Sequence, residues 1–163
     1  MRISSITYPD VNNGLGFRVT LWVQGCSHHC KGCQNKETWD FNGGREFSDN
    51  DKKIIFEALS KEYIKGITFS GGDPLDSFDE VYSLCNEIKK TFPNKDIWIY
   101  TGYTLEDIEK SRRKPLLDLV DILVDGEYNE ALRDISLAFR GSSNQVIWKK
   151  EKDKFVKSEL NNA

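Results

Sequence analysis

Three cysteines lie within eight residues of one another, at positions 26, 30 and 33. Thiolates at this spacing can converge on one soft metal centre, which restricts the choice chiefly to zinc, copper(I) or an iron–sulfur cluster. Three neighbouring cysteines are too close together and odd in number for a disulfide framework, so a metal or redox role in a reducing compartment is favoured. The sequence therefore predicts a thiolate-bound metal site at Cys26, Cys30 and Cys33.

Zinc and iron–sulfur sites make different demands on the fourth ligand. Structural zinc normally takes four protein ligands, so His28 or His29 would have to supply the fourth. Both histidines lie in the spacer between Cys26 and Cys30, where the short loop makes joint ligation awkward, and no second pair of ligands follows. A cluster of four irons held by three thiolates instead leaves one iron open to a small molecule. A zinc-binding interaction domain stays the alternative.

The remaining cysteine and the two histidines are expected outside the ligand set. Cys85 lies on the face of a predicted helix that also carries Val81 and Ile88. Free cysteine is among the most buried side chains, so we expect Cys85 to be a packing residue. His28 and His29 are interpreted as exposed loop residues.

Alternating strands and helices must position the cysteines. Strands are predicted at 17–24, 67–70, 96–100, 120–124 and 145–148, and helices at 48–65, 77–92 and 105–110. Ser48 with Asp51, and Ser77 with Glu80, are expected to form capping boxes. This order predicts a single α/β domain over residues 1–163, with a mostly parallel sheet as an open or partial (β/α) barrel of about five to six strands. The polar tail from about residue 149 is expected to be a solvated helix or a frayed end.

Four unusual loops follow the predicted strands. They are the cysteine loop, 71–74 (Gly-Gly-Asp-Pro), 101–103 (Thr-Gly-Tyr) and 125–126 (Asp-Gly). The carboxyl ends of parallel strands share one edge of a sheet, where ligands bind in these architectures. We therefore expect the four loops to form one site. The alternative for residues 71–74 is a purely structural turn that leads into a capped helix and binds no ligand.

Charge and hydropathy exclude several partners. The formal net charge of −3 offers no general attraction to nucleic acid or to anionic lipid. The first ten residues lack the pattern of a signal peptide, and no apolar run is long enough to span a bilayer. We expect a cytoplasmic protein with no nucleic-acid or membrane partner.

The cysteine spacing together with Gly71-Gly72-Asp73-Pro74 resembles the radical S-adenosylmethionine enzymes. Within that superfamily, residues 14–18, 24–26, 33–39 and 139–145 are similar to the activating proteins of anaerobic ribonucleotide reductases. The resemblance implies a [4Fe-4S] cluster held by the three cysteines, with S-adenosyl-L-methionine chelating the fourth iron. It covers most of the chain, from about Gly14 to Trp148.

The resemblance also implies cofactor-binding residues. Gly71 and Gly72 would let the backbone approach the methionine part of the cofactor, and Asp73, where the superfamily more often has Glu, would accept a hydrogen bond from its ammonium group. Gly32 stands where many relatives have an aromatic residue, which leaves adenine recognition unassigned. The remaining candidates are Gly32, Gln34, Thr101 and Asp125, of which the last two serve equally well as turn or cap residues.

By the same resemblance the protein is an oxidoreductase that activates a glycyl radical enzyme. An electron from a donor such as a flavodoxin or ferredoxin would cleave the cofactor to methionine and a 5′-deoxyadenosyl radical. That radical would take hydrogen from a glycine of the large catalytic subunit of anaerobic ribonucleotide reductase. No catalytic residue beyond the cluster and cofactor is expected. A different glycyl radical enzyme as the target stays open.

Overall fold

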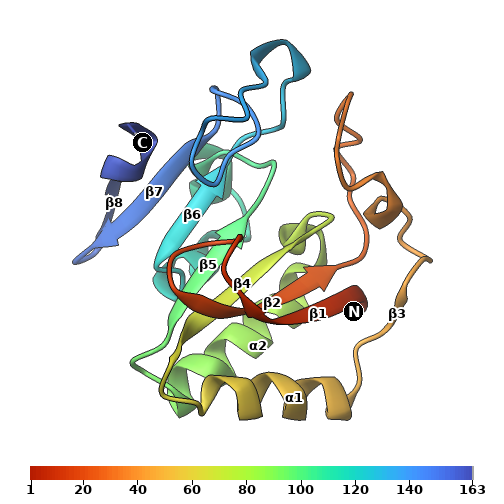
Figure 1. The fold of residues 1–163 in the computed structure, drawn as a ribbon, viewed down its shortest axis with the longest axis vertical. Helices are drawn as coiled ribbons and strands as arrows, with labels where there is room; N and C mark the ends of the chain where they lie inside the picture. Colours follow the sequence, from red (N-terminus) through yellow and green to blue (C-terminus); the bar gives the residue numbers. More distant parts are fainter. Residues whose placement is uncertain (163) are drawn as a thin grey trace.

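An eight-stranded sheet forms the centre of the computed structural model, which describes residues 1–162 (Figure 1). The strand order is β3-β1-β2-β4-β5-β6-β7-β8. The strands are β1 Arg2–Asp10, β2 Phe17–Val23, β3 Arg45–Glu46, β4 Ile64–Gly71, β5 Asp96–Tyr100, β6 Ile122–Asp125, β7 Val146–Glu151 and β8 Lys154–Lys157. In Figure 1 the sheet runs from β3 and β1 on the right to β7 and β8 on the left, with α1 along its lower edge.

The predicted mostly parallel (β/α) barrel of five to six strands is wrong. The sheet is mixed, and antiparallel pairs outnumber parallel pairs by four to three. Only β2, β4, β5 and β6 pair in parallel. The strands β1 and β3 extend one side of this unit, and β7 and β8 extend the other, all in antiparallel pairs.

Short connections explain the antiparallel edges. Residues 11–16 join β1 to β2, and residues 152–153 join β7 to β8, and neither is long enough for the crossover that a parallel pair requires. The tail from residue 149 accordingly completes β7 and forms β8, instead of a solvated helix or frayed end. The helix–strand alternation identified only the strands of the crossover units and the first part of β7.

Three α-helices accompany the sheet: α1 Asp49–Leu59, α2 Phe78–Thr91 and α3 Leu105–Glu109. Short 3-10 segments are η1 Lys36–Thr38, η2 Pro74–Ser77, η3 Lys114–Asp118, η4 Glu130–Leu132 and η5 Glu159–Asn162. The capping box of Ser48 and Asp51 is confirmed, whereas the side chain of Ser77 makes no capping hydrogen bond. The chain enters α2 through η2, whose first turn is capped by Asp73 through the Leu75 amide at 2.9 Å, so this end of the helix needs no Ser77 cap.

The core lies between the sheet and the helices. Strand residues such as Leu21, Phe69 and Ile99 are fully buried, and so is Cys85 on α2, which confirms it as a packing residue. Arg18 is also fully buried, and its guanidinium donates to Thr68 Oγ1 at 2.7 Å and pairs with Asp96. Burial of a charge is tolerated when it is paired and hydrogen-bonded, so this network joins β2, β4 and β5.

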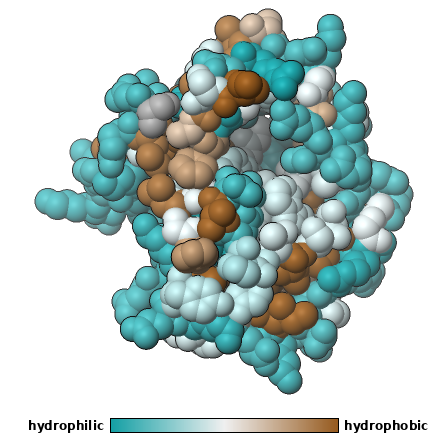
Figure 2. Space-filling view, in the orientation of Figure 1, coloured by the Kyte–Doolittle hydropathy of each residue, from teal (hydrophilic) through white to brown (hydrophobic). Residues whose placement is uncertain are grey.

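The surface carries scattered apolar side chains. Figure 2 shows polar residues around separate apolar patches in the orientation of Figure 1. The large apolar residues that are exposed are Val11, Leu15, Phe17, Phe41, Ile54, Tyr63, Leu132 and Ile135. Among residues 1–162, no helix has both the length and the apolar character needed to cross a membrane.

Candidate metal and cofactor site

The four parallel strands bring their following loops to one cavity of about 180 Å³, as the sequence predicted. Val23 at the end of β2 pairs with Gly71 at the end of β4, and Tyr100 of β5 pairs with Val124 of β6. The predicted site residues that line the cavity are Cys26, Cys30, Cys33, Gly71, Gly72, Asp73 and Thr101. His28, Trp39, Gly102 and Glu127 join them.

The cysteine loop is closed at its base by backbone hydrogen bonds. The Gly25 amide donates to the Thr38 carbonyl at 2.7 Å, and the Cys26 amide donates to the Trp39 carbonyl at 3.2 Å. The Gln24 side chain reinforces the closure by donating to the Glu37 and Asp40 carbonyls, each at 2.9 Å. Residues 24–40 therefore form a tied loop that holds all three cysteines at the carboxyl end of β2.

The three cysteines are half-buried free thiols. Cys33 Sγ accepts a hydrogen bond from the Asn35 amide at 3.4 Å, an interaction that stabilises a thiolate. Burial raises the pKa of Cys26 to about 11, and burial also raises the pKa of Cys30. In the metal-free protein these two thiols are protonated near neutral pH, so metal binding must displace their protons.

Two groups of possible metal ligands lie around the cavity, the three thiols and a cluster of one histidine with two carboxylates. Among residues 1–162, the group of three possible ligands whose atoms all lie within 4.8 Å of one another is His28, Asp73 and Asp76, and not the three cysteines. The three thiols line the cavity and the fourth cysteine is buried in the core, so the donor set fits a cluster with three protein ligands.

The two glycines of the turn after β4 pack directly on the base of the cysteine loop. A Cβ at Gly71 would lie 2.5 Å from the Val23 carbonyl oxygen, and one at Gly72 would lie 2.3 Å from the Gly25 carbonyl oxygen. The Gly72 amide donates to Val23 O at 2.8 Å, and the Asp73 amide donates to Gly25 O at 2.9 Å. Both glycines are therefore needed for backbone packing within the protein, whatever they do toward a cofactor.

Asp73 is a buried carboxylate that joins several loops, and only 1% of its surface is exposed. It accepts hydrogen bonds from the Leu75 amide at 2.9 Å and the Gly102 amide at 2.9 Å. The Thr101 hydroxyl lies 2.9 and 3.0 Å from its two oxygens, and His28 Nε2 lies 2.6 Å from Oδ2. The Asp73 carboxylate has about four positions at which it can accept a hydrogen bond, and these four donors use all of them.

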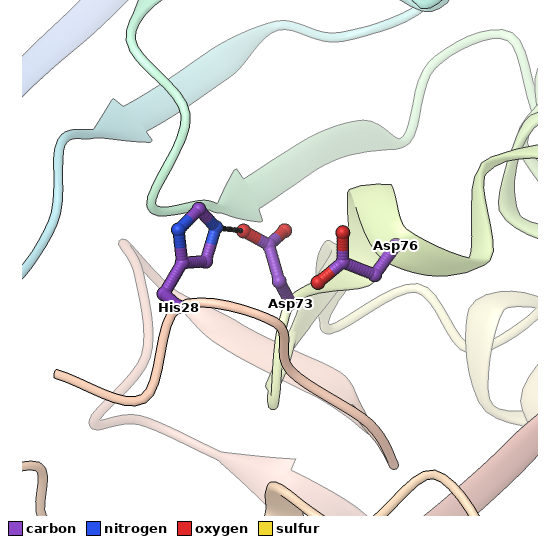
Figure 3. Close-up of side chains that lie close together, drawn as sticks. All are labelled: His28, Asp73 and Asp76. Carbon is purple, nitrogen blue, oxygen red and sulfur yellow. Dashed lines mark hydrogen bonds and ion pairs between the residues drawn. The ribbon is translucent and has the colours of Figure 1, made fainter.

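His28 departs from its predicted place as an exposed loop residue. Its ring contacts the buried Asp73 because the cysteine loop folds back over the turn after β4 (Figure 3). Only 11% of the His28 side chain is exposed. Its hydrogen bond with Asp73 raises the pKa of His28. His29 is exposed as predicted and stacks on Trp39 with ring centroids 4.6 Å apart. The sequence offered no signal that separates the two neighbouring histidines.

The other predicted cofactor residues, apart from Thr101, are not among those that line the cysteine cavity. Gly32 faces Glu130, whose Cδ would lie 2.9 Å from an added Cβ, and Gln34 is exposed. Asp125 accepts from the Leu105 amide at 2.7 Å and lines a larger neighbouring cavity of about 1170 Å³. The two cavities share Gly126, Glu127 and Tyr128. Thr101, by contrast, lines the cysteine cavity itself, with its hydroxyl bonded to Asp73.

The segment 139–145 supports the loop after β6. Gln145 Nε2 donates to the Gly126 carbonyl at 3.0 Å, and Asn144 Nδ2 donates to the Glu127 carbonyl at 2.8 Å. Gln145 Oε1 in turn accepts from the Gly141 amide at 2.9 Å. No role in the site was predicted for this segment from the sequence. Its similarity to the activating proteins was the one indication of a role.

A model of a known protein family matches most of the chain. Residues 12–148 match the family model described as a 4Fe-4S single cluster domain. The site described above, with three thiols on one cavity, lies inside the matched range.

Individual relatives identify a particular family among proteins with such a domain. The anaerobic ribonucleoside-triphosphate reductase-activating protein of Enterobacteria phage T4 is 44% identical over 144 residues, which cover 86% of this chain and 90% of the relative. The proteins of the same name from Haemophilus influenzae and Escherichia coli K12 are each 43% identical over 145 residues, covering 86% of this chain and 93% and 94% of the relatives. The chain belongs to the family of anaerobic ribonucleoside-triphosphate reductase-activating proteins, which confirms the resemblance drawn from the sequence.

Proposed function

We propose that this chain activates an anaerobic ribonucleotide reductase by reductive cleavage of S-adenosyl-L-methionine at a [4Fe-4S] cluster bound to Cys26, Cys30 and Cys33. The observation that carries the proposal is the cavity in which three half-buried thiols meet the Gly-Gly-Asp turn. The fourth cysteine, Cys85, is fully buried in the core. Three protein ligands leave one iron for a cofactor.

The chain's own residues would hold and shield the cluster. The hydrogen bonds of Gly25 and Cys26 to residues 38 and 39 fix where the first ligand begins, and the Asn35 amide points at Cys33 Sγ. Trp39 lines the same cavity and is half-buried, so it limits the access of water. A solvent-poor site strengthens every electrostatic contact made to the cluster and cofactor.

The cofactor would lie against the turn after β4. Gly71, Gly72, Asp73 and Thr101 line the cavity beside the thiols, which supports their assignment to the cofactor. A cofactor ammonium would have to share or replace one of the four donors to Asp73, so the direct contact stays a prediction. Gly32, Gln34 and Asp125 stay candidates for cofactor binding, although they do not line this cavity.

Cys26, Cys30 and Cys33 would hold the cluster beside the turn after β4, and the bound cluster would supply the electron for reductive cleavage of the cofactor that starts radical chemistry on the reductase. The protein's part is to orient the cofactor and to exclude water from the radical. A flavodoxin or ferredoxin as electron donor and a cytoplasmic location belong to the same proposal.

The test is anaerobic reconstitution with iron and sulfide. We expect a brown protein that, once reduced, releases 5′-deoxyadenosine from S-adenosyl-L-methionine and gives a glycyl radical signal in electron paramagnetic resonance when the reductase is added. Alanine at Cys30 should abolish both, whereas alanine at the buried Cys85 should preserve both. A colourless protein that is isolated under anaerobic conditions with one zinc per chain would refute the proposal in favour of a zinc-binding domain.

A further inference from the structure

The His28 side chain reaches from the cysteine loop to two other loops of the site. Its Nε2 lies 2.6 Å from Asp73 Oδ2, in the turn after β4, and its Nδ1 lies 3.1 Å from Glu127 Oε2, after β6 (Figure 3 shows the Asp73 contact). The two carboxylates differ in burial, since the side chain of Asp73 is 1% exposed and that of Glu127 is 57% exposed. The bond to Asp73 is therefore the less screened of the two.

The fold leaves room for this ring. A Cβ at Gly102 would lie 2.7 Å from His28 Nε2 and Cδ2, so any larger residue there would displace the imidazole. The Gly102 amide donates to the same Asp73 oxygen, at 2.9 Å. The Tyr103 ring packs edge-on against the imidazole with centroids 4.6 Å apart. His28 thus occupies a fitted position between the loops that follow β4, β5 and β6.

The base of the cysteine loop is already tied to the turn after β4 by the Asp73 amide, which donates to Gly25 O at 2.9 Å, and the bridge adds a side-chain tie beyond Cys26. The Ser27 amide donates to Asp76 Oδ2 at 2.9 Å, but Ser27 is exposed. His28 is the half-buried side chain between the first two thiols, Cys26 and Cys30. Its contact with Asp73 therefore fixes those thiols relative to the turn formed by Gly71, Gly72 and Asp73.

We propose that His28 is a positioning residue that holds the cysteine loop at a set distance from the Gly-Gly-Asp turn, and so aligns the cofactor on that turn with the open iron. This inference rests on the proposed function. His28 acts through Asp73 and Glu127 and need not touch the cofactor. Because misplacement by about 1 Å can cost roughly a hundredfold in rate, the bridge has a measurable effect on how the cofactor binds.

The chain offers a matched control in His29, which lies in the same spacer, is exposed, and contacts Trp39 instead of the strand-end loops. The variants are His28→Ala, His28→Gln and His29→Ala. Glutamine keeps one donor that can reach Asp73, so partial recovery in His28→Gln separates loss of the hydrogen bond from loss of bulk.

The first measurement uses the metal-free protein. Hydrogen exchange of the peptides covering residues 26–33 and 101–103 should accelerate roughly tenfold in His28→Ala and should stay at the wild-type rate in His29→Ala. Equal rates in wild type and His28→Ala would overturn the bridge. This result does not depend on whether the chain cleaves S-adenosyl-L-methionine.

The second measurement uses the reconstituted protein. His28→Ala should retain the wild-type iron content, raise the KM for S-adenosyl-L-methionine roughly tenfold, and lose the change in the electron paramagnetic resonance spectrum that the cofactor causes at a concentration that saturates wild type. His28→Gln should fall between, and His29→Ala should match wild type. An unchanged KM and spectrum in His28→Ala, or loss of iron from both His28 variants, would overturn the positioning role. Failure of wild type to release 5′-deoxyadenosine would count against the proposed function instead.

Discussion

Replacement of Gly72 by alanine should both destabilise the protein and disturb the cysteine loop. The added Cβ would lie 2.3 Å from Gly25 O and 2.8 Å from Thr38 O, against 3.4 Å or more in ordinary contact. Relief of this overlap must lengthen two backbone hydrogen bonds, Asp73 N to Gly25 O at 2.9 Å and Gly25 N to Thr38 O at 2.7 Å. The loss of two such bonds costs about 2 kcal/mol, and overpacking adds about 1 to 3 kcal/mol.

The expected loss of about 3 to 5 kcal/mol corresponds to a fall in Tm of at least about 6 °C for a chain of this length. Thermal unfolding of the metal-free protein, followed by circular dichroism, measures it. Because Gly25 precedes Cys26, which we propose as a cluster ligand, the iron content after reconstitution should also fall.

The control is Gly126→Ala. Gly126 has a φ of +95°, but its added Cβ would meet no atom closer than 3.8 Å, so only backbone strain of about 1 to 2 kcal/mol is expected. If Gly72→Ala unfolds at the same temperature as Gly126→Ala, or at a higher one, the close packing inferred for the turn is refuted.

Three further predictions test the fold around the site. Arg18→Ala should lower the free energy of unfolding by about 3 to 5 kcal/mol in urea titration, because it leaves Asp96 without its fully buried partner; a loss under 1 kcal/mol would contradict that network. The bond from Arg45 lowers the pKa of Asp51 to about 2, below its ordinary value of 3.8, so this carboxylate's contribution of roughly 2 kcal/mol is complete above pH 4 and disappears as the pH falls toward 2. Acid unfolding of Asp51→Asn should lack this component, and an unchanged acid transition would exclude it. Cys85→Ala should cost about 1 to 2 kcal/mol in stability yet keep the wild-type iron content, and a loss of iron would make Cys85 a ligand.

Local patterns in the chain identified most of the parallel unit. The apolar runs placed β2 and β5 within one residue, and Ser48 with Asp51 marked the start of α1, because strand periodicity and capping involve residues close in sequence. Gly66, taken as the end of that first helix, lies instead inside β4, where the backbone of Asp96 passes 2.2 Å from the position of a Cβ. From the sequence alone, a glycine that allows two strands to approach closely cannot be distinguished from a glycine that ends a helix.

The sequence patterns did not predict the antiparallel strands at the two edges of the sheet. No helix precedes β1 or β8, and the alternation of strands with helices therefore passed over both. The direction of β7 was also open, because residues 126–145 form an irregular connection from which neither a crossover nor a hairpin can be read. The antiparallel strands at these two edges make the sheet mixed, whereas a mostly parallel barrel was predicted.

The sequence by itself predicted a thiolate-bound metal site, because a single loop brings three thiols together within eight residues. It also determined that the Gly-Gly-Asp turn would follow the next parallel strand. Only the tertiary structure decided that Asp73 accepts from four donors and that His28, but not His29, is one of them. Those partners lie up to 45 residues apart, and their contact depends on how the loops after β2, β4 and β5 meet, which no local pattern encodes.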